Sequence, residues 1–298
     1  MANCLEECFE KNRKKLKYKE VIRMPITNVN GIELYYEVHG EGEPLLMIMG
    51  LAHNLLSWKK SLPGLAEHFK VIIFDNRGTG RSSKPETPYS IELMAEEAKA
   101  VLDEVGVESA HVYGISMGGM IAQRLALNFP DRVRSLILGC TSPGGINQVQ
   151  PDTEVIMTLL SGASIPTTPL EAAWASVPIL YSTYFIENHR DSIAEHIETM
   201  IEIPTPAHGF MQQLQACLAH DSYDELQKIN IPAFIIHGDA DRLIPVENGK
   251  MLADRIKDSE LYIVPGAGHL YVTEAQKDVD HRVIDFVKKH SIEKKILK

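Results

Sequence analysis

The 298-residue sequence has no long apolar run, few cysteines and no excess of positive charge. Because no stretch of about 18 apolar residues occurs, we expect no transmembrane helix. The formal net charge is −10, and the acidic residues are spread along the chain, which disfavours nucleic acid and anionic membranes as partners. No apolar segment suited to a signal peptide opens the chain, so we expect a cytoplasmic protein.

Cysteines are too scarce for a disulfide framework; the four are Cys4, Cys8, Cys140 and Cys217. Cys4 and Cys8 could share a helical face, but two thiols without further close ligands make a poor metal site. We therefore expect reduced thiols in a reducing compartment. The composition is that of an ordinary soluble globular protein, long enough for two domains or for one large α/β unit with an insertion.

A predicted hairpin follows a charged leader over residues 1–20. Two β-rich runs, 21–29 and 32–40, are joined by Asn30-Gly31. This dipeptide favours the positive φ angles of a type I′ turn, which links antiparallel strands.

Six short apolar runs then alternate with helical patterns. Because the runs lack polar alternation, they are typical of strands covered on both faces of a parallel sheet. One helix is expected over 90–105, with Ser90 as N-cap and Gly106 just past its end, and another over 117–128, which Pro130 prevents from continuing. The alternation predicts an α/β fold, a doubly wound and mostly parallel sheet with the hairpin as an antiparallel edge. The six runs are 45–49, 71–74, 111–114, 135–138, 233–236 and 261–264.

The strand pattern stops over residues 142–221. Prolines punctuate helical patterns there, and no buried strand is evident. We predict that this segment is an inserted helical cap, or lid. The α/β core would then comprise residues 21–141 and 222–298.

A candidate nucleophile lies in Gly114-Ile115-Ser116-Met117-Gly118, which matches G-x-S-x-G. The motif directly follows an apolar strand and directly precedes a helical run, as a nucleophile elbow requires. In so tight a turn, side chains at the glycine positions would clash, and the Ser116 hydroxyl is lifted clear of the sheet. The alternative is a Gly/Ser turn that merely joins a strand to a helix.

A serine hydroxyl needs a base, and the base needs an orienting carboxylate. In this fold class the carboxylate follows the serine along the chain, and the histidine follows the carboxylate. His269 follows the run 261–264 in a glycine-rich loop, at the end of the sheet where open α/β sheets form their sites. It is our candidate base. We expect His237 to be packed beside its loop, and His281 and His290 to be solvated on a terminal amphipathic helix.

Two candidate carboxylates, Asp239 and Asp241, follow the run 233–236. Their side chains should point in different directions, so we expect only one of them to reach His269. The spacing alone does not decide between them. The other would be a turn carboxylate that accepts hydrogen bonds from nearby backbone amides.

Taken together, these motifs resemble the α/β-hydrolase superfamily over residues 26–290. The resemblance implies the α/β-hydrolase fold and a catalytic triad of Ser116, Asp241 and His269, with Asp239 in a supporting position. The segments that carry it are Met49-Gly50-Leu51, FDNRGTGRSS (74–83), GISMGG (114–119), HGDADRLIP (237–245) and GAGH (266–269).

An oxyanion hole needs two preorganised donors. The backbone N–H of Met117, directly after the nucleophile, is one candidate, and the resemblance implies the N–H of Leu51 as the other. Most members of the family carry His-Gly where this chain has Met49-Gly50. Because the donor is a backbone group, the change affects the support of the loop rather than the donor itself.

Two nearby loops have open roles. Residues 75–82 are rich in glycine and arginine, but the lysine and serine pattern of a phosphate-binding P-loop is missing. The resemblance implies that this loop braces the floor of the active site. His53 and Asn54 either line the pocket or are ordinary loop residues.

A serine nucleophile argues against haloalkane dehalogenases and epoxide hydrolases, whose elbow carries aspartate. Segments 74–83 and 114–126 resemble those of 3-oxoadipate enol-lactonases and methyl esterases. We predict a serine hydrolase that cleaves a carboxylic ester or lactone of a small to medium, mostly apolar substrate through an acyl-enzyme. No metal or organic cofactor is expected, because the triad supplies its own nucleophile and base.

Other functions remain open within this fold. They are a carbon–carbon bond hydrolase, a perhydrolase, an aminopeptidase and a non-catalytic ligand receptor. Most large apolar side chains of the cap should pack the cap on the core, while some roof the cleft. These side chains are Met157, Leu159, Leu160, Trp174, Leu180, Tyr181, Tyr184, Phe185, Met200, Phe210 and Met211.

Overall fold

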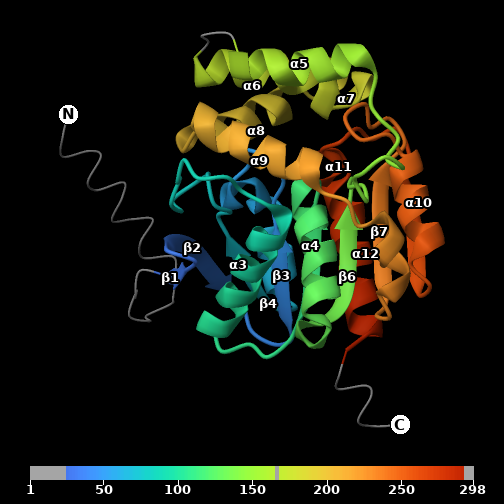
Figure 1. Cartoon of the computed structure of the whole chain (residues 1–298). Helices are drawn as coiled ribbons and strands as arrows, with labels where there is room; N and C mark the ends of the chain where they lie inside the picture. Colours follow the sequence, from blue (N-terminus) through green and yellow to red (C-terminus); the bar gives the residue numbers. More distant parts are fainter. Residues whose placement is uncertain (1–24, 165–167, 292–298) are drawn as a thin grey trace, which may run out of the picture.

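The computed structural model describes residues 25–164 and 168–291, without the side chains of 161–164. The predictions for the charged leader and for the pair Cys4 and Cys8 therefore lie outside the described residues. Over the described ranges, no helix is long and apolar enough to cross a membrane. Eight strands in this part of the chain form one sheet, in the order β1-β2-β4-β3-β5-β6-β7-β8 (Figure 1).

The predicted hairpin is confirmed. β1 and β2 pair antiparallel, and Asn30 and Gly31 between them have φ angles of 49° and 76°. β2 also pairs antiparallel with β4, whereas the pairs from β4 through to β8 are all parallel. The strands are β1 (Ile26–Val29), β2 (Ile32–His39), β3 (Pro44–Ile48), β4 (Lys70–Phe74), β5 (Ala110–Ile115), β6 (Val133–Gly139), β7 (Ala233–Gly238) and β8 (Ser259–Val264).

Helices cover both faces of the sheet, as the apolar strand patterns predict. Along β3, Leu46 and Ile48 join the core beneath one helical layer, while Leu45 and Met47 join the core beneath the other. Successive residues of a strand point to opposite faces, so a strand that is apolar throughout supplies both cores. The first layer holds α3 (Ile91–Glu104), α4 (Met117–Asn128) and α10 (Glu247–Arg255), and the second holds α2 (Leu62–Ala66) and α12 (Gln276–Lys289).

The predicted helix ends are also confirmed. The Ser90 hydroxyl accepts a hydrogen bond from the N–H of Leu93 at 3.1 Å and caps α3. Gly106, just after this helix, has a φ of 66°, a left-handed conformation that glycine adopts at little cost. α4 ends at Asn128, two residues before Pro130.

Two expectations for the C-terminal part are wrong. Strand β8 is not covered on both faces, because it lies at the edge of the sheet and its Leu261 is 40% exposed. In the last helix, His281 is exposed as expected. His290, which directly follows this helix, is half-buried and packs its ring 4.7 Å from that of Phe286, so it is not fully solvated.

A helical layer lies over the carboxyl ends of the strands (Figure 1). The chain enters and leaves this layer at one place, where Gly144 forms a β-bridge with Asp221 and the N–H of Ser222 donates to the carbonyl of Pro143 at 2.8 Å. The layer has a hydrophobic core of its own, to which Leu270 contributes. Its helices are α5 (Thr153–Ser164), α6 (Pro169–Leu180), α7 (Thr183–Asn188), α8 (Arg190–Glu202) and α9 (Ala207–Ala219).

His220, at the base of this layer, makes the stability of the fold sensitive to acid. Its ring is 2% exposed, and its nitrogens have no hydrogen-bond partner among the described residues. Burial, helped by the charge of Arg124, lowers the pKa of His220 to about 3. The unfolded chain binds a proton at this side chain below about pH 6.5, whereas the folded chain does not. The free energy of unfolding therefore falls as the pH falls from about 6.5 towards 3.

We expect His220 to lower the free energy of unfolding by about 2 kcal/mol at about pH 5. The free energy of unfolding is measured with urea at about pH 7.5 and at about pH 5. Its decrease between these two pH values should be smaller for His220→Leu than for the wild type by that amount. His281→Leu is the matched control, because the His281 side chain is exposed, and its pH dependence should equal that of the wild type. An unchanged pH dependence in His220→Leu contradicts the prediction.

Candidate active site

Ser116 lies in a sharp turn between β5 and α4, with φ 56° and ψ −123°. This backbone conformation is strained for a residue that has a side chain, so surrounding contacts must hold it. The N–H of Ser116 donates to the carbonyl of Gly139 at 2.8 Å, and the hydroxyl of Thr141 donates to the carbonyl of Ser116 at 2.7 Å. The strand–turn–helix geometry predicted from the motif is thus present.

The glycines of the motif permit a very close approach of backbones. A Cβ on Gly114 would lie 2.1 Å from the carbonyl oxygen of Gly118, and one on Gly118 would lie 2.1 Å from that of Ile48. Any side chain at these positions would push the strand and the helix apart. Gly50 also lies close to the serine, because a Cβ there would lie 2.9 Å from the Cβ of Ser116. The loop after β3 therefore lies directly against Ser116.

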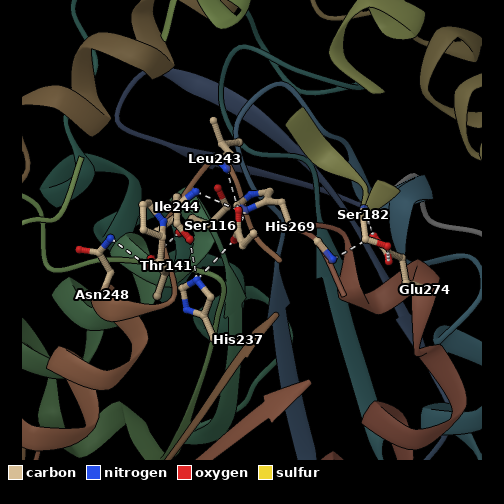
Figure 2. Close-up of polar contacts among 12 residues, drawn as sticks. Ser116, Thr141, Ser182, His237, Leu243, Ile244, Asn248, His269 and Glu274 are labelled. Carbon is tan, nitrogen blue, oxygen red and sulfur yellow. Dashed lines mark hydrogen bonds and ion pairs between the residues drawn. The ribbon is translucent and has the colours of Figure 1, made fainter. Parts of the chain in front are cut away.

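His269 and Asp241 form a buried hydrogen-bonded pair. The Nδ1 of His269 lies 2.8 Å from Oδ2 of Asp241, and a carboxylate can only accept, so this nitrogen carries the proton. Nε2 of His269 is then the basic nitrogen. The other oxygen of Asp241 accepts from the N–H groups of Leu243 and Ile244, each at 2.9 Å. Figure 2 shows Ser116 and His269 gathered beside the loop that carries Leu243 and Ile244.

Asp239 does not contact the pair formed by His269 and Asp241. It is exposed, and its Oδ1 accepts the N–H of Gly266 at 2.6 Å. We expected the aspartate that does not reach His269 to accept a hydrogen bond from a nearby backbone amide, and Asp239 does so. Of the two carboxylates that the sequence left open, the structure brings Asp241 to His269, the candidate base.

A second histidine, His237, also contacts Asp241. Its Nε2 lies 2.8 Å from the carbonyl of Ile244 and 3.3 Å from Oδ2 of Asp241. Both partners are acceptors, so this nitrogen carries a proton. Burial acts to raise the pKa of Asp241, but the charges and hydrogen bonds of His269 and His237 outweigh it and hold the pKa below its usual value. The sequence placed His237 beside the loop without showing this contact.

Cys140 completes the surroundings of this pair. It is fully buried, and its sulfur lies within 4.8 Å of a carboxylate oxygen of Asp241 and of a ring nitrogen of His269. Burial raises the pKa of the Cys140 thiol well above its usual value, so the thiol is neutral and brings no competing charge to the pair.

The loop after β3 is braced from three directions. The side-chain amide of Asn76 donates to the carbonyl of Met49 at 2.9 Å, and Asp75 accepts the N–H of Leu55 at 2.8 Å. Gln213, from helix α9, accepts the N–H of Ala52 at 2.8 Å. The first two contacts agree with the bracing role implied for residues 75–82. The contact with Gln213 comes from 161 residues away and could not be found from the sequence.

Arg77 is not available to bind a ligand. It forms a buried ion pair with Glu97, in which Nε lies 2.8 Å from Oε1, and its guanidinium lies 5.0 Å from the centre of the Tyr89 ring. The structure therefore agrees with the absence of a phosphate-binding pattern in this loop.

The loop that carries His269 is fastened to the helical layer by Glu274. This carboxylate accepts the N–H of Gly268 at 3.1 Å and both the N–H and the hydroxyl of Ser182, at 2.9 and 2.6 Å (Figure 2). The N–H of Leu270 also donates to the carbonyl of Leu180 at 2.9 Å. The position of the candidate base thus depends on the helical layer above it.

A large cavity of about 1010 Å³ lies between the core and the helical layer. Ser116, His269, Leu51 and Met117 all line it, so the four sequence-predicted residues face one space. His53 lines it too. Asn54 serves the local fold instead, because its side chain accepts the N–H of Leu56 at 2.9 Å and caps a short helical turn.

The prediction that most large apolar residues of the helical layer pack it on the core is not confirmed, because five of the eleven line the cavity. Tyr181 and Phe185 belong to the hydrophobic core of the layer itself, while Met157 and Tyr184 are exposed. The residues of that set that line the cavity are Leu159, Leu160, Leu180, Met200 and Phe210.

A family model described as the alpha/beta hydrolase fold matches residues 43–275. The chain belongs to the α/β-hydrolase family. A predicted carbamate hydrolase, RutD of Azorhizobium caulinodans, is 31% identical over 252 residues, which are 83% of this chain and 92% of the relative.

Solved structures of other α/β-hydrolases are similar over nearly the full length. An esterase from Thermogutta terrifontis is 26% identical with a TM-score of 0.77, covering 91% of this chain and 99% of the esterase. The enol-lactonase from Burkholderia xenovorans LB400 is 25% identical with a TM-score of 0.79, covering 89% of this chain and all of the lactonase. The family and these names together support hydrolase activity on small molecules.

Proposed function

We propose that this α/β-hydrolase is a serine hydrolase that cleaves a carboxylic ester or lactone of a mostly apolar substrate through an acyl-enzyme. The observation that carries the proposal is the buried hydrogen bond between His269 and Asp241, with Ser116 in the wall of the same cavity. A nucleophile and a base that face one cavity, with an orienting acid hydrogen-bonded to the base, are the parts that acyl transfer requires.

In the proposed mechanism, the Ser116 hydroxyl attacks the carbonyl carbon while Nε2 of His269 takes its proton. The N–H groups of Leu51 and Met117 would bind the developing oxyanion, and the close contact of Gly50 with Ser116 supports this placement. His269 then protonates the leaving alcohol, which departs and leaves the acyl group on Ser116. Water, activated by His269, hydrolyses the acyl-enzyme. Asp241 stays ionised and stabilises the histidinium throughout.

We further propose that residues 142–221 act as the lid of this site, and that the core comprises 21–141 and 222–298. The single neck between Gly144 and Asp221 supports an inserted unit, and side chains of α5, α6, α8 and α9 form part of the cavity wall. A lid over the strand ends would exclude water from the reacting groups.

The proposal is tested with a panel of p-nitrophenyl esters, lactones, thioesters and aminoacyl amides, together with covalent labelling by a fluorophosphonate. We expect turnover of esters or lactones with a burst of p-nitrophenol, and mass-spectrometric detection of the label on Ser116. Turnover of the aminoacyl amides alone would favour an aminopeptidase. Absence of turnover, burst and label would favour a ligand receptor of the same fold.

A further inference from the structure

The wall of the cavity carries no aspartate, glutamate, lysine or arginine among the described residues that line it. Most of the wall is formed by Leu, Ile, Met, Ala and Pro side chains. Apart from the Ser116 region and His269, its polar side chains are His53, Gln148, Gln150, Thr158, Ser176 and Thr205.

The two titratable side chains of the wall other than His269 are also neutral. Burial, with the nearby His196 and His269, lowers the pKa of His53 to about 3. Burial raises the pKa of the Cys217 thiol to about 12. At neutral pH these groups therefore present hydrogen-bonding or apolar surface, and neither supplies a charge that could pair with an ionised substrate.

Most of the lining residues that are exposed to solvent are also apolar, although Gln150 is exposed too. Among the lining residues that reach solvent, Leu218 is 75% exposed, Leu160 39% and Ile156 36%. A molecule entering the site would thus meet aliphatic side chains before it reaches Ser116. The volume of about 1010 Å³ is at the upper end of the range for pockets that bury drug-sized ligands.

We propose that the preferred substrates are uncharged esters or lactones with a long apolar acyl group, and that the cavity rejects substrates that carry a free carboxylate. This inference rests on the proposed function and specifies its substrate class. A carboxylate drawn into the cavity would lose its hydration with no cation to pair with it. Each methylene of an acyl chain, in contrast, gains from leaving water.

The inference argues against two types of substrate that the relatives of this chain suggest. The enol-lactone of 3-oxoadipate keeps one free carboxylate, for which the cavity offers no cationic partner among the described residues. A small carbamate would leave most of the volume unfilled. An uncharged ester with about eight or more acyl carbons would use the apolar wall that the helical layer provides.

The test measures kcat/KM of the full chain on p-nitrophenyl acetate, butyrate, octanoate and decanoate, and on the p-nitrophenyl monoester of suberic acid. The suberate ester matches the octanoate in chain length but ends in a carboxylate. We expect octanoate to exceed acetate by about 100-fold, which is about twofold for each of the six added carbons and about half of the free energy that full burial of a methylene contributes. We expect the suberate ester to fall at least about 100-fold below the octanoate.

Equal rates for octanoate and suberate, or a preference for acetate, would overturn the inference while leaving the serine hydrolase intact. Failure to hydrolyse any of the esters, with no fluorophosphonate label on Ser116, would overturn the proposed function instead. The two failures are therefore distinguishable in one set of measurements.

A pair of variants tests whether the missing cation causes the rejection. Ala175 lies on α6, lines the cavity and is exposed, so a longer side chain there does not disturb the core. Ala175→Lys should raise the suberate-to-octanoate ratio of kcat/KM at least about tenfold, because it supplies a counter-charge. Ala175→Met, of similar length and uncharged, should leave the ratio unchanged. An unchanged ratio in Ala175→Lys, or an equal rise in both variants, contradicts the proposed cause.

Discussion

We expect Ser116→Ala to remove nearly all of the proposed esterase turnover, lowering kcat by about 10³ to 10⁶, the range found when a triad nucleophile is deleted. The physical reason is that no acyl-enzyme can form when the attacking oxygen is absent. Residual turnover would come from substrate binding and the oxyanion donors alone. The measurement is steady-state hydrolysis of p-nitrophenyl butyrate, with enzyme concentrations high enough to detect the residual rate.

The control for this variant is a measurement showing that it still folds like the wild type. Alanine fits wherever serine fits, and the elbow is held by backbone contacts with Gly139 and by the Thr141 hydroxyl. The midpoint of thermal unfolding should therefore stay within a few degrees of the wild type. Near-normal turnover in Ser116→Ala would refute Ser116 as the nucleophile.

Asp241→Asn lowers kcat by about 10³ to 10⁴, the second large effect that we expect. An asparagine at this position can donate its amide N–H to Nδ1 of His269. That contact would favour the tautomer with the proton on Nε2, which cannot accept the proton of Ser116. The same variant also removes the negative charge that stabilises the histidinium and that lies 3.3 Å from His237.

Asp239→Asn is the matched control, two residues away in the same loop. Its contact is the N–H of Gly266 at 2.6 Å, and the carbonyl of an asparagine can still accept that hydrogen bond. We expect kcat within about threefold of the wild type, a change typical of a substitution outside the reacting groups. A larger loss in Asp239→Asn than in Asp241→Asn would assign the orienting role to Asp239.

Much of the fold could be predicted from the sequence because the signals are local. Asn30-Gly31 predicted the hairpin, since the positive φ of both residues is an intrinsic property of this dipeptide. Ser90 and Gly106 marked a helix through hydrogen bonds and backbone angles within a few residues. The sequence did not reveal that β8 is a sheet edge, because an apolar run reads the same whether one or both of its faces are covered.

The elbow at Ser116 could also be predicted from the sequence. Its glycines, the strand before it and the helix after it are contiguous, and together they fix the shape of the turn. The choice between Asp239 and Asp241 could not be predicted from the spacing, because the direction of each side chain depends on what the loop packs against. The family resemblance implied Asp241, and the contact with His269 spans 28 residues of chain.

The sequence by itself therefore determined the α/β fold, the order of the strands along the chain and the candidate residues Ser116 and His269. Only the tertiary structure decided that Asp241 lies between two histidines, that Gln213 braces the loop beside Ser116, and that the described residues of the cavity wall carry no charged side chain. Propensity, capping and turn chemistry act between neighbours in the chain. A charge-free cavity arises only where side chains from many distant segments converge, and convergence is a property of packing.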